Sequence, residues 1–192
     1  MVTAYLYLAL LAAVGLERLF EIGLSRRNAR RALARGGIEC DAGHYRFMKA
    51  LHLSFLIACG AEVVLLGRAF HPWLAAAMLA AAVLAQALRY WSIWTLGDRW
   101  NVRVIVVPGE PVVTRGPYRF VRHPNYAAVA IEGVALPMIH TAWLTALVLT
   151  LANTALLAVR IGCEERALGT HTDYRAALGD RARFLPARGP WH

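Results

Sequence analysis

The sequence predicts an all-α, polytopic integral membrane protein with about five transmembrane helices. Of its 192 residues, 58% are hydrophobic, well above the fraction in an average soluble domain. Apolar segments long enough to cross a hydrocarbon core of about 30 Å recur along the chain. The formal charge of +9 comes almost wholly from arginines that lie between these segments, so we attribute it to membrane orientation rather than to nucleic acid binding.

The chain shows no linker between domains and no internal repeat, so we expect one domain over residues 1–192. Within it we distinguish an N-terminal and a C-terminal part. The expected spans are residues 2–24, 48–66, 72–96, 126–139 and 141–161. The first three make up the N-terminal part, residues 1–96; the first is expected as a retained span, because it lacks the basic start and cleavage pattern of a signal peptide. The last two form either a tight helical hairpin or one long broken segment within residues 97–192, together with a polar connector and a polar tail.

The positions of the arginines predict the orientation. Segments 25–49 and 97–125 and the tail after residue 160 are rich in Arg, whereas the 67–71 turn has only Arg68 and the tip of the hairpin has no basic residue. The positive-inside rule then places the N-terminus outside and the C-terminus in the cytoplasm. The compact, Ala- and Arg-rich sequence indicates a bacterial inner membrane protein.

The polar connector follows the third span from residue 97 and ends with the stretch 116–126, Gly-Pro-Tyr-Arg-Phe-Val-Arg-His-Pro-Asn-Tyr, which is too dense in Arg, His and Tyr to be lipid-facing. Pro117 and Pro124 keep the residues before them out of the α region, so we expect an irregular turn. Irregular backbone at membrane depth needs protein or water to satisfy its polar groups, which predicts a polar pocket. Nearby, residues 102–114 are expected to form a short surface hairpin, and residues 163–178 a polar helix.

Several separated motifs in the C-terminal half resemble the isoprenylcysteine carboxyl methyltransferase family. They occur in the family's order and cover roughly residues 88–186. In this sequence they are Trp-Thr-Leu-Gly-Asp-Arg-Trp at 94–100, Val-Thr-Arg-Gly-Pro-Tyr-Arg at 113–119, Arg-His-Pro-x-Tyr at 122–126, Glu-Glu-x-x-Leu-Gly at 164–169, Tyr174, and Arg-Phe-Leu-Pro at 183–186.

The resemblance implies a membrane methyltransferase that uses S-adenosylmethionine. In that family the connector, the last hairpin and the following helix surround the cofactor on the cytosolic side, and a groove between helices admits a lipophilic acceptor from the bilayer. Carried over by position, the pocket residues are Gly116, Tyr118, Arg122, His123, Pro124 and Tyr126, with Arg160, Glu164 and Glu165 facing them. Two positions depart from the family pattern: Ala177 replaces a common tyrosine, and Glu132 replaces an apolar residue.

The residue types fit the chemistry of this cofactor. Arg122 or Arg160 can pair with its carboxylate, and Glu164 or Glu165 with its ammonium group. Aromatic rings can stack on the adenine or face the sulfonium cation; the candidates are Trp100, Tyr118 and Tyr126. Arg160 and Glu165, with Glu132, are the candidate catalytic residues. The three cysteines have no metal-ligand spacing, so no metal site is expected.

The expected reaction is O-methylation, and the sequence leaves two kinds of acceptor open: a prenylcysteine-type carboxylate, or the hydroxyl of a long-chain phenolic or pyrone lipid. A carboxylate is already ionised, whereas a phenol must lose its proton as it reacts. Glu132 lies two turns into an apolar helix, where a carboxyl readily holds a proton. It is therefore the candidate general base and favours a hydroxyl acceptor.

Three alternatives remain open on the sequence alone. Arg122 and His123 could anchor the chain at the lipid headgroups without any role in catalysis. Membrane sterol reductases share a similar C-terminal core, so the protein could bind NADPH. A lipid-binding or transport protein without catalysis is the third alternative, although only one broken segment, near Pro137, supports it. The sequence does not indicate an oligomeric state.

Overall fold

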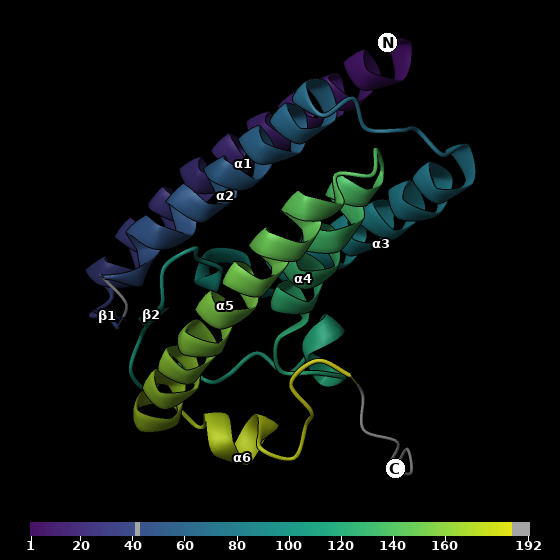
Figure 1. Cartoon of the computed structure of the whole chain (residues 1–192). Helices are drawn as coiled ribbons and strands as arrows, with labels where there is room; N and C mark the ends of the chain where they lie inside the picture. Colours follow the sequence, from purple (N-terminus) through teal and green to yellow (C-terminus); the bar gives the residue numbers. More distant parts are fainter. Residues whose placement is uncertain (41–42, 186–192) are drawn as a thin grey trace.

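The computed structural model describes residues 1–40 and 43–185, which fold into the predicted all-α, polytopic membrane protein. Figure 1 shows α1 and α2 side by side, and α3, α4 and α5 as a second group of helices. The short α6 lies at the end of the molecule opposite the N-terminus, which we call the α6 end; the tip of the α4–α5 hairpin marks the other, hairpin end. The main helices are α1 (Val2–Ala34), α2 (His44–Leu65), α3 (Pro72–Leu96), α4 (Pro124–Met138), α5 (Trp143–His171) and α6 (Tyr174–Leu178).

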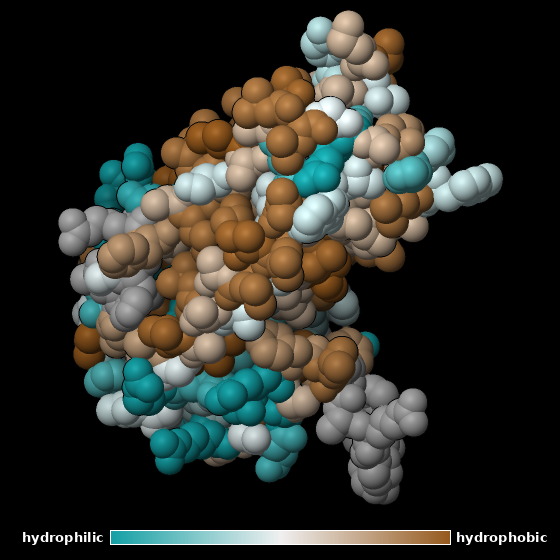
Figure 2. Space-filling model, in the orientation of Figure 1, coloured by the Kyte–Doolittle hydropathy of each residue, from teal (hydrophilic) through white to brown (hydrophobic). Residues whose placement is uncertain are grey.

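Four of the described helices, α1, α2, α3 and α5, are long and apolar enough to cross a membrane. The expected segment 126–139 is present as α4, but with 15 residues it is not one of these four helices, so the structure has four spans of this kind among the described residues instead of about five. At 1.5 Å per residue α4 is about 22 Å long, short of a hydrocarbon core of about 30 Å. Hydrophobic residues cover the middle of the molecule, and hydrophilic residues gather at the α6 end (Figure 2).

Helix α1 continues well beyond the expected boundary at residue 24 and ends at Ala34. Its last turns are stabilised by contacts with the connector: the Ser25 hydroxyl donates to Oδ1 of Asn101 at 2.7 Å, and Nδ2 of Asn28 donates to the carbonyl of Trp100 at 2.8 Å. Much of the basic segment 25–49 is therefore helical rather than a loop.

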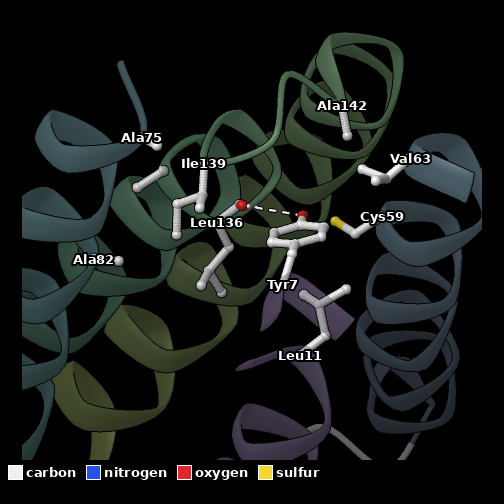
Figure 3. Close-up of a cluster of buried hydrophobic side chains, with 10 residues drawn as sticks. Tyr7, Leu11, Cys59, Val63, Ala75, Ala82, Leu136, Ile139 and Ala142 are labelled. Atoms are coloured by element: carbon white, nitrogen blue, oxygen red, sulfur yellow. Dashed lines mark hydrogen bonds between the residues drawn. The ribbon is translucent and has the colours of Figure 1, made fainter. Parts of the chain in front are cut away.

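Proline interrupts the backbone hydrogen bonding of α4 near its end, and neighbouring helices compensate. Pro137 has no N–H to donate to the carbonyl of Gly133. That carbonyl accepts a hydrogen bond from Thr150 of α5 at 3.3 Å instead. The carbonyl of Leu136 accepts one from the Tyr7 hydroxyl at 3.1 Å, within the apolar cluster drawn in Figure 3. The break in α4 therefore becomes a packing contact between α1, α4 and α5.

The start of α5 is held by a buried carboxylate. Glu62 of α2 accepts hydrogen bonds from the backbone N–H groups of Leu144 and Thr145, at 3.1 and 2.7 Å, and pairs with Arg68 at 2.7 Å. A negative charge at a helix N-terminus is stabilised by the unpaired N–H groups and the helix dipole. Glu62 thus joins α2 to the hairpin end of α5.

Two expectations about the polar segments are wrong. Residues 102–114 do not form a hairpin, because β2 (Ile105–Val106) pairs antiparallel with β1 (Ile38–Glu39) of the first loop. Residues 163–178 do not form one helix: α5 continues to His171, and the chain turns at 172–173 before α6. Glu164 and Glu165 therefore lie inside the last turns of α5 rather than at the start of a new helix.

Candidate active site

A cavity of about 840 Å³ lies among α1, α2, α4, α5 and the connector. At the α6 end its lining is aromatic and charged and includes Trp100, Tyr118, Arg122, His123, Tyr126, Arg160, Glu164 and Tyr174. Away from that end the lining becomes apolar and includes Leu19, Leu51, Leu56 and Leu136. This volume is at the upper end of the 300–1,000 Å³ or so that is usual for small-molecule sites.

The α6 end of the cavity is organised around the phenol of Tyr126, in the first turn of α4. Nε of Arg160 donates to the Tyr126 hydroxyl at 2.6 Å, and that hydroxyl donates to Oε2 of Glu164. Arg160 also donates to the carbonyl of Val102 in the connector and approaches Sδ of Met48 at 3.5 Å. Because Arg160 is only 5% exposed, this network fixes α5 against α4, α2 and the connector.

Just behind this network, Glu165 forms ion pairs and hydrogen bonds with several cationic and polar side chains. It accepts from Nη2 of Arg183 at 2.7 Å, and its other oxygen lies 3.2 Å from Nη1 of Arg122 and 3.1 Å from Nε2 of His123. The Tyr174 hydroxyl approaches the same oxygen at 3.5 Å. The connector, the end of α5 and the tail therefore meet at one carboxylate.

The tail also pairs with the connector through the backbone. The N–H groups of Arg122 and His123 donate to the carbonyls of Ala182 and Arg183, both at 3.0 Å. Arg181 donates to the carbonyl of Tyr118. The rings of His123 and Tyr126 stack with centroids 5.4 Å apart. These contacts hold the irregular backbone before α4, which has no regular secondary structure to satisfy it.

The connector also depends on a glycine. Gly116 begins the 3-10 turn η2 (Gly116–Arg119) with a φ of +59°, and a Cβ there would lie 2.4 Å from Oγ1 of Thr95 on α3. Only glycine fits both the left-handed backbone and this close approach. Gly116 thus lets η2 pack directly against α3.

Two of the buried phenols near the connector, Tyr118 and Tyr174, remain protonated. Burial, with the nearby carboxylate of Glu165, raises the pKa of Tyr174 to about 12. Burial, together with the negative charge of Glu164, raises the pKa of Tyr118 well above its ordinary value. Both are neutral hydrogen-bonding groups at physiological pH.

A second charged cluster lies on the apolar part of the cavity. Nη2 of Arg18 on α1 pairs with Glu132 of α4 at 2.7 Å, and Nη1 of Arg18 pairs with Glu21 at 3.1 Å. Glu21 also binds Arg89 of α3, with contacts at 2.7 and 2.6 Å. Glu132 is therefore a member of an ion-pair network and not the isolated carboxyl that the sequence led us to expect.

The structure brings most of the predicted site residues to one cavity. Those that line it are Trp100, Tyr118, Arg122, His123, Tyr126, Glu132, Arg160 and Glu164. Gly116, Pro124 and Glu165 lie behind its lining, where they hold the connector and its side chains in place. Glu132 stands apart from the α6 end, six residues along α4 from Tyr126, or about 9 Å at the helical rise.

The polar residues of the cavity that sequence reasoning missed include Asn125 and Asn153. Oδ1 of Asn125 is buried without a hydrogen-bond partner among the described residues. The signal for Asn125 was its place inside the Arg-His-Pro-x-Tyr motif, at the variable position. Asn153 lies in an apolar stretch of α5, where no neighbouring motif marks it. Pro186, the last residue of the Arg-Phe-Leu-Pro motif, lies outside the described residues.

The comparisons with known proteins agree with this site. A model of the isoprenylcysteine carboxyl methyltransferase (ICMT) family matches residues 75–170, which include the connector, α4 and nearly all of α5. The chain belongs to this family. It is therefore a membrane methyltransferase, and the matched region supplies Tyr126, Arg160 and both glutamates of the α6 end.

Two bacterial relatives extend the similarity to most of the chain. Uncharacterized protein YpbQ of Bacillus subtilis (strain 168) is 35% identical over 160 residues, which are 83% of this chain and 94% of the relative. An uncharacterized protein of Haemophilus influenzae is 28% identical over 152 residues, 79% of this chain and 88% of the relative. The family region and these relatives together cover both helix groups that form the cavity.

Proposed function

We propose that the protein transfers a methyl group from S-adenosylmethionine to an oxygen of a lipophilic acceptor. The observation that carries the proposal is a single cavity with two chemically different parts. Its α6 end has paired charges and aromatic rings, and its other part is lined by aliphatic side chains of α1, α2 and α4. Such a cavity suits a charged nucleotide at one end and a lipid at the other.

The residues at the α6 end fit the cofactor. Buried Nε of Arg122 has no hydrogen-bond partner among the described residues, so it is available to a carboxylate. Arg160, in contrast, already donates to Tyr126 and Val102, which makes Arg122 the better candidate for this contact. Glu164 is the candidate for the ammonium group, and Trp100 and Tyr126 for the adenine or the sulfonium cation.

The cofactor, when bound, supplies an electrophilic methyl group on a sulfonium. The chain's own residues then orient the reactants and exclude water. Arg160 holds Tyr126 and the connector in place, and Glu165 positions Arg122 and His123 from behind. Both residues thus act through their neighbours, although Arg160 lines the cavity and Glu165 does not.

The acceptor would reach the site from the bilayer, through the apolar part of the cavity. Either a prenylcysteine-type carboxylate or the hydroxyl of a phenolic or pyrone lipid satisfies this geometry. We further propose an inner membrane location with the α6 end in the cytoplasm, where the methyl donor is available. The arginine distribution supports this orientation, and the two relatives come from bacteria.

Thermal unfolding of the purified protein with S-adenosylhomocysteine or with NADPH tests the proposal against the reductase alternative. We expect S-adenosylhomocysteine to raise the Tm of the protein and NADPH to leave it unchanged. Mass spectrometry of membrane lipids from cells with the wild-type protein, compared with cells carrying Arg160→Ala, should then show species that gain one methyl group only with the wild type. Stabilisation by NADPH and not by S-adenosylhomocysteine would refute the proposal.

A further inference from the structure

The charged cluster on the apolar part of the cavity is built from three helices. Arg18 and Glu21 come from α1, Arg89 from α3, and Glu132 from α4. Glu17 of α1 completes it by pairing with Arg18 at 3.1 Å. Glu21, Arg89 and Glu132 are each less than 8% exposed. Ionisable side chains that are this little exposed are costly to bury in a membrane protein. Their presence here therefore indicates a role beyond helix packing.

Two atoms of this cluster are not used by the ion pairs. Nη1 of Arg89 and Oε1 of Glu132 are buried and have no hydrogen-bond partner among the described residues. Both side chains line the cavity, as do Arg18 and Glu21. A cluster that served only to join the helices would be expected to satisfy its buried donors and acceptors. One buried donor and one buried acceptor are therefore left unsatisfied in side chains that line the cavity.

We propose that this cluster binds the polar head of the methyl acceptor, and that the acceptor is a hydroxyl lipid rather than a carboxylate. The inference rests on the proposed function and deepens it. The acceptor's hydroxyl donates to Oε1 of Glu132, and Nη1 of Arg89 donates to an oxygen of the same head group. The acyl or alkyl tail lies along the aliphatic lining between α1 and α2.

The charges of the cluster favour this choice of head group. Two arginines, Arg18 and Arg89, are shared among three carboxylates, and the bound N–H groups already point at protein oxygens. A carboxylate acceptor would add a further negative charge beside Glu132, and Nη1 of Arg89 is the one buried donor of the cluster without a partner among the described residues. A hydroxyl can donate to Glu132, which a carboxylate cannot do.

The placement also suits the reaction. Glu132 lies about 9 Å along α4 from Tyr126 and lines the same cavity, so a methyl donor that extends that far from the α6 end would reach a head group at Glu132. In the transfer, the acceptor O–H proton passes to Oε1 of Glu132. The acceptor oxygen forms the new bond to the methyl carbon, and the electron pair of the broken S–CH3 bond returns to sulfur, which leaves a neutral thioether. The proton is released to solvent in a later step.

Binding of two matched probes tests this inference without any turnover. We would measure the affinity of the purified full chain for para-dodecylphenol and para-dodecylbenzoate, which share a ring and a tail and differ in the hydroxyl or carboxylate. We expect the phenol to bind at least about tenfold more tightly than the benzoate, because a like charge in a buried site is strongly unfavourable. Equal binding, or tighter binding of the benzoate, would overturn the inference.

Glu132→Gln should change the preference in a direction that simple destabilisation cannot produce. The amide N–H of Gln replaces a charged acceptor, so phenol affinity should fall and benzoate affinity should rise. Glu62→Gln is the matched control, because it changes a buried carboxylate at the hairpin end that does not line the cavity. Its preference for the phenol should equal that of the wild type.

A second variant keeps the test informative if Glu132→Gln does not fold. Arg18→Gln combined with Glu132→Gln removes both partners of one ion pair. Glu21 keeps its pair with Arg89, and Glu17, which loses Arg18, keeps the hydrogen bond from Gln86. The same loss of phenol preference is expected. A wild-type preference in this variant would count against the inference.

Binding of S-adenosylhomocysteine, measured on the same preparations, distinguishes a failure of the proposed function from a failure of the acceptor inference. If it binds and the benzoate is preferred, the acceptor inference fails and the proposed function stands. If it does not bind while the phenol preference holds, the proposed function fails and the head-group site stands.

Discussion

The two ends of the cavity are built in different ways. At the α6 end, the connector, the last turns of α5 and the tail meet through backbone pairing and through Glu165, so residues far apart in the chain define the site. At the other end, the charged cluster uses side chains from the faces of regular helices. The α6 end therefore depends on irregular backbone held in position, whereas the cluster depends on how α1, α3 and α4 pack together.

This difference separates two tasks within one enzyme. Most of the α6 end lies within the family match at residues 75–170, while Arg18 and Glu21 of the cluster lie outside it. On the two proposals above, binding of the methyl donor and choice of the acceptor use different side chains, so we expect them to vary independently. The following predictions test that separation, beginning with the largest expected effect.

Arg160→Ala should reduce kcat/KM for methyl transfer by about 100-fold or more, because one buried guanidinium holds both Tyr126 and the connector. Arg160→Lys should recover little, since a single ammonium cannot reproduce the divergent donors of the guanidinium. The control is Arg166→Ala on the same helix, whose guanidinium contacts Cys163 near the surface. Initial rates with labelled methyl donor measure the effect; wild-type rates for Arg160→Ala would disprove it.

Glu165→Gln should raise KM for the methyl donor by about tenfold or more, with a smaller change in kcat, because Glu165 positions Arg122 and His123 without lining the cavity. Affinity for para-dodecylphenol should not change, which distinguishes the two ends. Asp98→Asn, in an exposed pair with Arg31, is the control. A loss confined to kcat would assign Glu165 a direct part in the reaction.

Gly116→Ala should destabilise the protein by about 1–3 kcal/mol, because alanine is strained at positive φ and its Cβ would overlap Thr95. Adding Thr95→Ala should restore part of this loss by removing the overlap, while the backbone strain remains. Thermal unfolding of the single and double variants measures both contributions. Full recovery in the double variant would show that strain at Gly116 is negligible.

Glu62→Gln should lower stability by about 1–2 kcal/mol, since it weakens the bonds to the first N–H groups of α5 and the pair with Arg68. Affinity for S-adenosylhomocysteine should equal that of the wild type, because Glu62 is at the hairpin end. A matching loss of cofactor affinity would mean that the hairpin end and the α6 end are energetically coupled.

Tyr7→Phe should have the smallest effect, about 0.5–1.5 kcal/mol of stability. It removes only the hydrogen bond to the carbonyl of Leu136 and keeps the ring in the apolar cluster of Figure 3. Methyl transfer rates should be unchanged. A large loss of activity would show that the break at Pro137 controls the position of Glu132.

The sequence alone determined the membrane class, the long apolar helices and the residues of the α6 end. Hydrophobic length and arginine position are local properties, so they can be read without knowing the packing. The Gly-Pro-Tyr and Arg-His-Pro-x-Tyr motifs likewise marked the connector, because two prolines forbid a regular helix there. The family resemblance then brought the motifs together at one site, and most of those residues line one cavity.

Only the tertiary structure decided the boundaries and the partners. Helix α1 runs past residue 24 because Ser25 and Asn28 bind the connector, and β2 pairs with the first loop, neither of which a local pattern can show. The partner of Glu132 is Arg18, which lies 114 residues earlier and meets it only because α1 packs beside α4. The sequence gives the type of each side chain, but its ion-pair partner depends on which helices are neighbours in the fold.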